Sequence, residues 1–573
     1  MRFQKTHPPI RNPCESAPLW RLLAVQKLFS TPEPQQNFTG GVPGVQWKSS
    51  TGQPGDRPSP PPALTGVPGQ PEDTDSFALF LGLVTTVALI LRLLVVGLGS
   101  GTGIEAAYTP DTAIEMQLAD NLVQSQSFGV AEYPQGSRFS LIEAAREARG
   151  ERKPFENSTL YPDAYHVPGY ASVLALFQKL ELHLRWLLLT QCLIAAGSTL
   201  VMYRIVLNLI GRKAPALLAA SLTAVHPALV IAPAALSGGV IALALLLLGL
   251  WAVARRNTSN PLIACAGGLA FGIAALFNPT LFWAAPVVGA WLLISGRNVN
   301  ATLVTAALLF GSAVPSGLWI YRNAQAGFGP TLACNADLEK YLGVLGQLEA
   351  PHATPNVRDE AMLASLPKLS SDETKNGITL LDQIRTETHW RIREQGNAYF
   401  QLGRDLALRR LIDHSVDHTF ARLKLDYTAP QGGVARWLDS KLPQSEDPSS
   451  TTSVVNAWVG SNFLLLAATI MGSVALMWRR RIYEVALPLS LGLTLLVSCL
   501  TVTGEAARLP VISLQLLLVA GILCPVPVRA AKRSKKRGGN GLDGMKLQRI
   551  TPGPGGPLAP LGTAPAPTNA DNI

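Results

Sequence analysis

A carboxylate lies shortly after the first long apolar run of the chain. Asp111 follows Pro110, and an apolar pattern with helical spacing begins directly after it. A carboxylate in such a place can act as a general base that takes a proton from an attacking hydroxyl group. Thr112 and Glu115 also have the spacing of a capping box, and a negative charge stabilises the start of a helix. The residues leave both roles open for Asp111, and one side chain can serve both.

Other polar and charged side chains stand where loops meet apolar runs. His166 and Tyr170 close the loop that Asp111 opens, in the sequence His-Val-Pro-Gly-Tyr. Arg322 and Arg508 lie at the ends of apolar runs, where a cation can bind a phosphate group. Arg92 lies inside a run, and an ionisable residue there is a functional candidate. Alternatively, the segment from His166 to Tyr170 can be only a turn that enters a surface helix, and Arg322 and Arg508 can extend to lipid headgroups.

Metal and disulfide chemistry have little support in the sequence. His389, His414 and His418 have no recognised ligand spacing, and His226 stands beside Pro227 in an apolar run, which favours a structural role. The cysteines are scattered, without a Cys-x-x-Cys pair, at Cys14, Cys192, Cys265, Cys334, Cys499 and Cys524. Neither a zinc site nor a disulfide framework is indicated. A divalent metal is possible but not indicated, and we predict no metal site and no other cofactor.

The composition is that of a membrane protein. Of the 573 residues, 48% are hydrophobic and 15% are charged, which is more apolar and less charged than a soluble globular protein. Most of the long apolar runs approach the roughly 20 residues that cross a bilayer. We therefore predict an all-α polytopic membrane protein with about ten transmembrane helices. The predicted spans are Phe77–Leu98, Leu184–Leu207, Ala214–Leu236, Val240–Ala254, Leu262–Phe277, Leu281–Ile294, Ala301–Tyr321, Val454–Trp478, Val485–Val502 and Leu509–Cys524.

The positions of the cations predict the orientation. Lys and Arg are enriched in short cytoplasmic loops, whereas long translocated loops are largely exempt from this rule. Alternate connections between the predicted spans carry Arg204, Arg212 and Lys213, then Arg255 and Arg256, then Arg297, then Arg479, Arg480 and Arg481. These cations fall on one side if both termini are cytoplasmic. We predict an integral protein of the plasma or inner membrane, and we interpret the net charge of +10 mainly as a topology signal rather than a nucleic-acid site.

This orientation divides the chain into three parts. Residues 1–76 are rich in Pro, Gly, Ser and Gln and predict a disordered cytoplasmic tail without a cleaved signal peptide. Residues 77–525 form the transmembrane domain, which includes outer loops at residues 100–183 and 322–453. Residues 526–573 are first basic and then Pro-rich, and they predict a second disordered cytoplasmic tail beside anionic lipid. Apolar residues at helical spacing in the first outer loop indicate helices on the outer surface of the membrane.

Short motifs follow one another in a fixed order along residues 77–525. They are Leu91-Arg92-Leu93, the outer Asp111, Ala119-Asp120-Asn121-Leu122, Pro168-Gly169-Tyr170, Arg185 with Gln191, His226-Pro227, Trp319-Ile320-Tyr321-Arg322-Asn323 and Glu505-Ala506-Ala507-Arg508-Leu509-Pro510. In this order they resemble the membrane glycosyltransferases of the GT-C fold. The narrower resemblance is to the dolichyl-phosphate-mannose-protein mannosyltransferase-like group, which is similar to glycosyltransferase family 39.

The resemblance implies transfer of a sugar from a polyprenyl-phosphate carrier to an acceptor on the outer membrane face. Asp111 would be the catalytic base, and Arg322 and Arg508 would stabilise the carrier phosphate as it leaves. Further substrate-binding candidates are His166, Tyr170, Arg92 and Glu505. The implied partners are a polyprenyl-phosphate-linked sugar and membrane lipid. The sequence does not identify the acceptor, whether glycan, lipid or protein, and it indicates no nucleic acid.

Several positions depart from the family pattern. The family often has a second acid or a Tyr where this chain has Thr112 and Glu115, Ser-Glu where it has Ser237-Gly238, and Arg-Pro where it has Asn278-Pro279. These departures favour an alternative, a non-catalytic GT-C-like protein that binds lipid-linked glycan or an envelope partner. A third class, a transporter, predicts paired repeats and broken helices, and the sequence shows no convincing internal repeat.

Overall fold

A computed structural model describes most of the chain between residues 74 and 523. The described ranges are 74–100, 104–109, 111–134, 137–155, 158–254, 260–296, 299–350, 353–366, 379–402, 452–478, 482–499 and 508–523. All belong to the second of two compact units, which begins at Asp73. Almost all regular structure in these ranges is helical, which confirms the all-α prediction. The predicted tails, residues 1–76 and 526–573, lie outside the described residues apart from positions 74–76.

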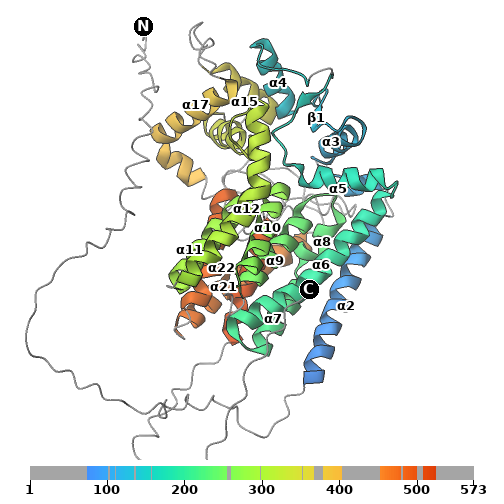
Figure 1. Cartoon of the computed structure of the whole chain (residues 1–573), viewed down its shortest axis with the longest axis vertical. Helices are drawn as coiled ribbons and strands as arrows, with labels where there is room; N and C mark the ends of the chain where they lie inside the picture. The colour runs from blue at the N-terminus through green and yellow to red at the C-terminus, as the bar shows by residue number, and fades with distance from the viewer. Residues whose placement is uncertain are drawn as a thin grey trace, which may run out of the picture. The chain divides into compact units, whose positions relative to one another are not determined.

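Helix is present at each of the ten places where a span was predicted. The helices are α2 (Thr74–Ser100), α6 (Leu184–Ile210), α7 (Lys213–Val225) with α8 (Pro227–Ile231) and η3 (Ala232–Ala234), α9 (Gly239–Val253), α10 (Pro261–Phe277), η4 (Pro279–Trp283) with α11 (Ala284–Gly296), α12 (Val299–Gln325), α21 (Thr452–Trp478), α22 (Ile482–Cys499), and α23 (Arg508–Val519) with η7 (Ala520–Leu523). Figure 1 shows the longer of these helices side by side.

In the described part of the chain, fewer helices have the length and apolar composition of a membrane span than the sequence predicts. Among the described residues, Ser76–Leu98, Leu184–Ile210 and Val299–Gln325 meet the length and composition of a span, and the bent segment of α7, α8 and η3 is a fourth if it counts as one. The prediction of about ten spans is therefore not confirmed. For α9 and α10 the physical reason is length, because they have 15 and 17 residues, or roughly 22 to 26 Å against a hydrocarbon core of about 30 Å.

A break divides the third apolar segment. α7 and the α8–η3 segment meet at His226-Pro227 with a bend of 59°. Pro227 has no backbone N–H, so the carbonyl of Thr223, four residues earlier, lacks its helical donor. Arg92 of α2 replaces that donor, because its Nη2 donates to Thr223 O over 3.2 Å and its Nη1 donates to Ala224 O over 3.0 Å. The broken helix and the buried arginine therefore depend on each other.

α10 and α12 approach each other through glycines. A Cβ atom on Gly268 would lie 1.9 Å from the carbonyl oxygen of Leu308, and one on Gly311 would lie 2.2 Å from that of Cys265. Small residues at such crossings allow two helix backbones to approach closely in a membrane. The backbones of α10 and α12 leave no room for a side chain at either position.

The Gly311→Ala variant is expected to lower the thermal midpoint of the full chain, since its methyl group overlaps the Cys265 carbonyl and forces the helices apart. Overpacking of this kind costs about 1–3 kcal/mol. Gly317→Ala on the same helix is the matched control, because a Cβ atom there meets nothing within 4 Å. It is expected to be neutral or stabilising by up to about 1 kcal/mol. Equal midpoints for the two variants in a thermal unfolding assay would contradict the close contact.

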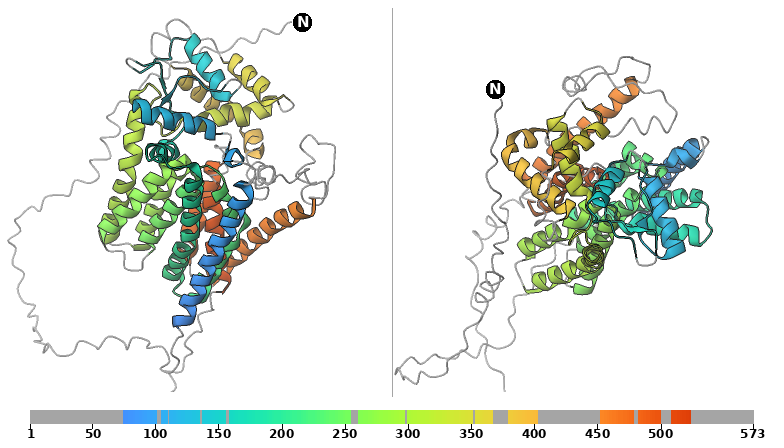
Figure 2. Two further views of the ribbon diagram at one scale, coloured as in Figure 1. Left: turned by 90° about the vertical axis from the view of Figure 1, so that its right-hand side faces the viewer. Right: turned by 90° about the horizontal axis from the view of Figure 1, so that it is seen from above.

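The remaining described elements come from both predicted outer loops. They are η2 (Ile104–Ala107), α3 (Thr112–Ser125), β1 (Gly129–Val130), α4 (Arg138–Ala148), β2 (Tyr161–Pro162), α5 (Pro168–Lys179), α13 (Asn335–Leu338), the π-helical η5 (Glu339–Leu345), α14 (Gly346–Glu349), α15 (Pro355–Ala364) and α17 (Leu380–Glu394). We call them the head region. Figures 1 and 2 show most of it beyond one end of the long helices, with α5 lying across that end.

The two loops share one hydrophobic core and one ion-pair network. Ile142 of α4 and Tyr165 are buried in the same cluster as residues of η5, α15 and α17. Arg138 of α4 binds Glu339 and Asp359 of the second loop, each over 2.7 Å. The strands β1 and β2 pair antiparallel inside the first loop. The head region is thus one packed body in which segments some 200 residues apart hold each other.

Candidate functional site

Asp111 lies in the turn between η2 and α3 with an exposed side chain. Its backbone occupies the N-cap position of α3, yet its carboxylate makes no capping hydrogen bond. The hydroxyl of Thr112 is engaged elsewhere, because it donates to Leu236 O over 3.0 Å and accepts from Thr109 N over 2.7 Å. The hydrogen-bonded cap considered for Asp111, and the capping box of Thr112 with Glu115, are therefore not formed.

The end of the bent third segment lies against the turn of Asp111. Leu236 N donates to Ala107 O over 2.8 Å, and Leu236 O accepts from Thr112. Gln191 of α6 donates to Ala235 O over 3.0 Å. These bonds join η2, α3 and α6 to the chain that leaves η3. The chain that follows the break at Pro227 therefore lies beside the turn that holds Asp111.

His166 lies next to a buried carboxylate. Asp163 is fully buried, accepts from His166 N over 3.1 Å and lies 3.3 Å from the imidazole Nδ1. The hydroxyl of Tyr133 also donates to Asp163. The other ring nitrogen of His166, Nε2, is buried and has no hydrogen-bond partner in the described part of the chain. Asp163 therefore orients the ring, and Nε2 is the edge left for another group.

The charges around His166 shift two pKa values. Burial alone would lower the pKa of His166, but the Asp163 carboxylate, with smaller contributions from Asp111 and Glu115, raises it to about 9. Burial raises the pKa of Glu115 to about 8, and Asp111 adds to the rise while His166 opposes it. At neutral pH His166 is an imidazolium and Glu115 is mainly a neutral carboxylic acid. We call Asp111, Glu115, Asp163 and His166 the Asp111 cluster.

The stability of the protein is expected to fall as the pH rises from 4.5 to about 8, because folded Glu115 holds a proton that an unfolded glutamate has released. Glu115→Gln keeps the shape of the side chain and removes this titration. The free energy of unfolding of the variant, relative to that of the wild type, should therefore rise by up to about 1.4 kcal/mol per pH unit in that window. Thermal unfolding of both proteins over the window measures the difference. Parallel curves would show that Glu115 is ionised in the folded state.

Deprotonation of His166 causes a second loss of stability at higher pH. Its folded pKa of about 9 lies above the ordinary value of 6.5, so its contribution to stability is complete below pH 6.5 and is lost as the pH approaches about 9. A thermal scan extended to about pH 9 separates the two groups, because Glu115→Gln leaves in place Asp163, the main cause of the raised pKa of His166.

Arg322 lies near the end of α12, and its side chain reaches the backbone of the first outer loop at Asp163 and Phe128. Its Nη1 donates to Asp163 O and, over 2.9 Å, to Asn323 Oδ1, while its Nη2 donates to Phe128 O. Its guanidinium carbon lies 4.8 Å from the ring centroid of Trp319. All these partners are neutral. Arg322 thus adds a positive charge beside Asp163 without pairing with a carboxylate of the described chain.

Tyr170 is buried behind the Asp111 cluster. Its hydroxyl donates to Gln191 Oε1 over 3.3 Å, which joins α5 to α6. Burial raises the pKa of Tyr170, and Glu115 raises it further, which shows that the two groups influence each other. Tyr170 therefore supports the cluster from the side of the helix bundle.

Of the other predicted binding residues, Arg92 is described and is not brought to this cluster. Arg92 is buried between α2 and α7, where it also donates to Ala88 O over 2.7 Å. Arg508 begins α23, but its side chain lies outside the described residues, as does the whole of Glu505. The structure thus gives Arg92 a task in holding the helix break, rather than a place on the surface that a carrier phosphate would reach.

Metal ligands do not gather in the described part of the chain. No group of three or more His, Cys, Asp or Glu side chains there has the arrangement to hold a metal ion. His389 lies on α17, while His414 and His418 lie outside the described residues.

Asp163 is the functional candidate that the sequence reasoning missed. It stands three residues before His166, a spacing that lets a carboxylate reach the backbone and ring of a histidine across a tight turn. Tyr133, its other partner, lies 30 residues earlier, and no local pattern connects the two. The short spacing was a usable signal, whereas the tyrosine was not foreseeable.

No protein-family model and no curated protein matches this chain.

Proposed function

We propose that the protein is a GT-C-like membrane glycosyltransferase, which moves a sugar from a polyprenyl-phosphate donor to an envelope acceptor on the outer membrane face. The observation that carries the proposal is the state of Asp111. Its carboxylate is exposed, makes no cap, and lies within electrostatic reach of the His166 imidazolium. A carboxylate that performs no structural task beside a positive charge has the properties of an acceptor base.

The reaction gives each group a task. The acceptor hydroxyl attacks the anomeric carbon, and a new C–O bond forms while the bond from that carbon to the carrier phosphate oxygen breaks, leaving its electron pair on the phosphate. Asp111 accepts the hydroxyl proton. His166 and Arg322 supply positive charge where the phosphate leaves. Glu115, mainly neutral at pH 7, adds little competing negative charge.

The proposal includes a membrane arrangement that goes beyond the three long apolar helices. All ten helical segments cross the membrane, both termini are cytoplasmic, and the head region faces outward from the plasma or inner membrane. The shorter helices require local thinning of the bilayer or flanking residues that extend to the headgroups. The cations between the segments support this orientation.

A donor panel tests the proposed activity. Purified full-length protein in proteoliposomes is incubated with labelled polyprenyl-phosphate sugars, and membrane extract supplies acceptors. We expect label to leave the lipid fraction with at least one donor and to appear in an acceptor fraction. Absence of transfer across the panel, with the protein folded and the donors bound, would contradict the proposal.

The alternative is a non-catalytic protein that binds lipid-linked glycan or an envelope partner. One observation favours it, namely that both terminal nitrogens of Arg322 already donate to carbonyls of the chain. A carrier phosphate would have to displace or share those bonds. Donor binding without turnover would favour this alternative. Solute flux in the same proteoliposomes would instead favour a transporter, a class in which broken helices such as α7 and α8 are common.

A further inference from the structure

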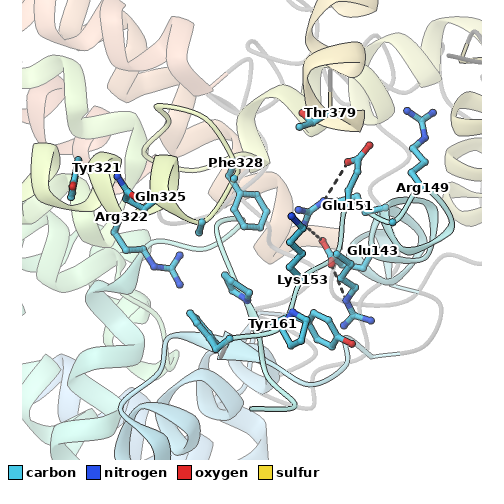
Figure 3. A pocket seen from close by; sticks show the side chains of 18 residues that line it. Glu143, Arg149, Glu151, Lys153, Tyr161, Tyr321, Arg322, Gln325, Phe328 and Thr379 are labelled. Carbon is cyan, nitrogen blue, oxygen red and sulfur yellow. Dashed lines mark hydrogen bonds and ion pairs between the residues drawn. The ribbon is translucent and has the colours of Figure 1, made fainter. Parts of the chain in front are cut away.

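The head region contains a pocket that the proposed reaction does not explain. It has a volume of roughly 980 Å³ and lies between the end of α4, strand β2, the end of α12 and the start of α17. Figure 3 shows Arg322 entering from one side and Glu143, Glu151 and Arg149 on the other. The size is at the upper end of what small-molecule sites have, about 300 to 1,000 Å³.

Five cationic and two acidic side chains line the pocket, so it carries three positive charges in excess. The cations are Arg146, Arg149, Arg152, Lys153 and Arg322, and the acids are Glu143 and Glu151. Whether this excess is available to a ligand depends on which cations the two acids neutralise.

Glu143 neutralises charge on the floor of the pocket. It lies 2.7 Å from Arg146 and 3.1 Å from Arg152, and it accepts a hydrogen bond from the buried Tyr165. Both arginines also lie over aromatic rings, Arg146 at 4.4 Å from the centroid of Phe328 and Arg152 at 3.6 Å from that of Tyr161. These two cations are committed to holding the pocket together.

Glu151 is committed to a helix terminus. Both of its oxygens accept from Leu380 N, over 2.9 and 3.0 Å, at the first turn of α17. A carboxylate in that place satisfies an orphan amide and interacts with the positive end of the helix. Its closest cation is Arg146, at 3.9 Å. Glu151 therefore neutralises none of the three remaining cations.

Arg149, Lys153 and Arg322 are left without a carboxylate partner in the described chain. Arg149 donates to the neutral Gln383 Oε1 over 2.8 Å, and Arg322 donates to carbonyl and amide oxygens. Lys153 is exposed at the rim. Arg149 and Lys153 come from the chain that follows α4 and Arg322 comes from α12, and the three line one cavity, whose unpaired positive charge can bind an anionic group.

The walls between the cations suit a sugar rather than a bare ion. Tyr161, Phe155, Tyr321 and Phe328 line the pocket with ring surfaces, and Thr379, whose hydroxyl caps α17 together with Asp382, lies beside them. Flat apolar surfaces with a few directed polar groups are the usual lining of a small-molecule site. Arg322, which lies in the wall of this pocket, also bonds to the backbone of Asp163 in the Asp111 cluster.

We propose that this pocket binds the acceptor, and that the acceptor is an acidic saccharide whose anionic group lies beside Arg149 and Lys153, whereas Arg322 on the opposite side serves the carrier phosphate. The role of acceptor rests on the proposed transfer reaction, but binding of an acidic saccharide can be measured without turnover.

The test is a binding titration of the full-length protein in nanodiscs with a hyaluronan tetrasaccharide and with the same tetrasaccharide after reduction of its carboxyl groups. We expect the acidic form to bind at least about tenfold more tightly than the reduced form, and added salt to weaken that difference. Lys153→Gln should raise the dissociation constant by about threefold or more, and Arg149→Gln with Lys153→Gln by about tenfold or more.

Lys179→Gln is the matched control, because Lys179 is exposed on α5 and does not line the pocket; its affinity should equal that of the wild type. Lys153 bonds to no described residue, so its variant tests the site without loss of a contact that holds the fold.

Equal affinity for the two tetrasaccharides would overturn the inference. Competitive displacement by farnesyl phosphate would also overturn it, because the pocket would then belong to the carrier. Acidic-saccharide binding without donor turnover would support the pocket and contradict the proposed transfer reaction.

Discussion

Replacement of Asp111 by Asn is expected to lower the rate of sugar transfer by about 100-fold to 10,000-fold, the contribution typical of a positioned general base. Asn keeps the size of the side chain and loses the ability to accept the proton. Since the Asp111 carboxylate caps no helix and has no other polar partner in the described chain, the substitution removes no contact that holds the fold. The measurement is the initial rate of label transfer at matched donor occupancy, with the thermal midpoint recorded beside it.

Asp120→Asn is the matched control for this experiment. Asp120 is exposed on the same helix and accepts from Gln178 over 2.7 Å, so the variant makes the same change of charge on α3. It is expected to transfer sugar at the wild-type rate. An equal loss in both variants would trace the effect to the charge of the helix. Unchanged turnover in Asp111→Asn would remove Asp111 from the mechanism.

Arg92→Leu is expected to destabilise the protein by roughly 2–4 kcal/mol and to reduce the yield of folded protein. The substitution leaves the carbonyls of Thr223 and Ala224 without their side-chain donor at a break that Pro227 imposes. Each buried acceptor that loses its partner costs about 1–3 kcal/mol, and relief from burying the arginine charge offsets part of the sum. Thermal unfolding and size-exclusion chromatography measure the loss.

Arg204→Leu provides the comparison for Arg92→Leu. Arg204 is exposed on α6, so the same substitution there removes a cation without exposing a backbone acceptor. We expect a change within about 0.5 kcal/mol of the wild type. If Arg92→Leu were equally harmless, the carbonyls at the break would have another source of donors, and Arg92 could be reconsidered as a binding residue.

The positions of the helices were predictable because apolar runs in a chain of this composition have few other uses. α2, α6 and α12 correspond closely to predicted spans. The bend of the third segment was less accessible to sequence reasoning. Pro227 was visible, but its cost depends on whether a donor from elsewhere reaches Thr223, and that donor comes from a residue 131 positions away.

The head region shows the same limit more strongly. Helical spacing in the first loop correctly indicates α3 and α5, since Ile114 and Leu118 recur on one buried face. Nothing local indicates that Arg138 binds Glu339 and Asp359 and so joins two loops into one body. Pairings across some 200 residues are set by packing, which a single sequence does not display.

The candidate site was predictable in its location and less so in its chemistry. Asp111, His166 and Arg322 were selected from their places at the ends of apolar runs, and the structure brings His166 to the buried carboxylate of Asp163 and Arg322 to the backbone carbonyl of the same residue. The neutral state of Glu115 was not predictable, because it follows from burial and from neighbours on other elements. Tyr170 and Arg92 have structural contacts that the sequence did not indicate, since Tyr170 bonds to Gln191 and Arg92 bonds to the carbonyls at the helix break.

The most direct test of the central claim is the position of a bound carrier headgroup, observed by cryo-electron microscopy of the full-length protein in nanodiscs with a non-hydrolysable polyprenyl-phosphate sugar analogue. The proposed function requires the phosphate within hydrogen-bond distance of Arg322 or His166 and the anomeric carbon facing Asp111. Density for the headgroup at another face of the protein, with Asp111 turned to solvent, would contradict it.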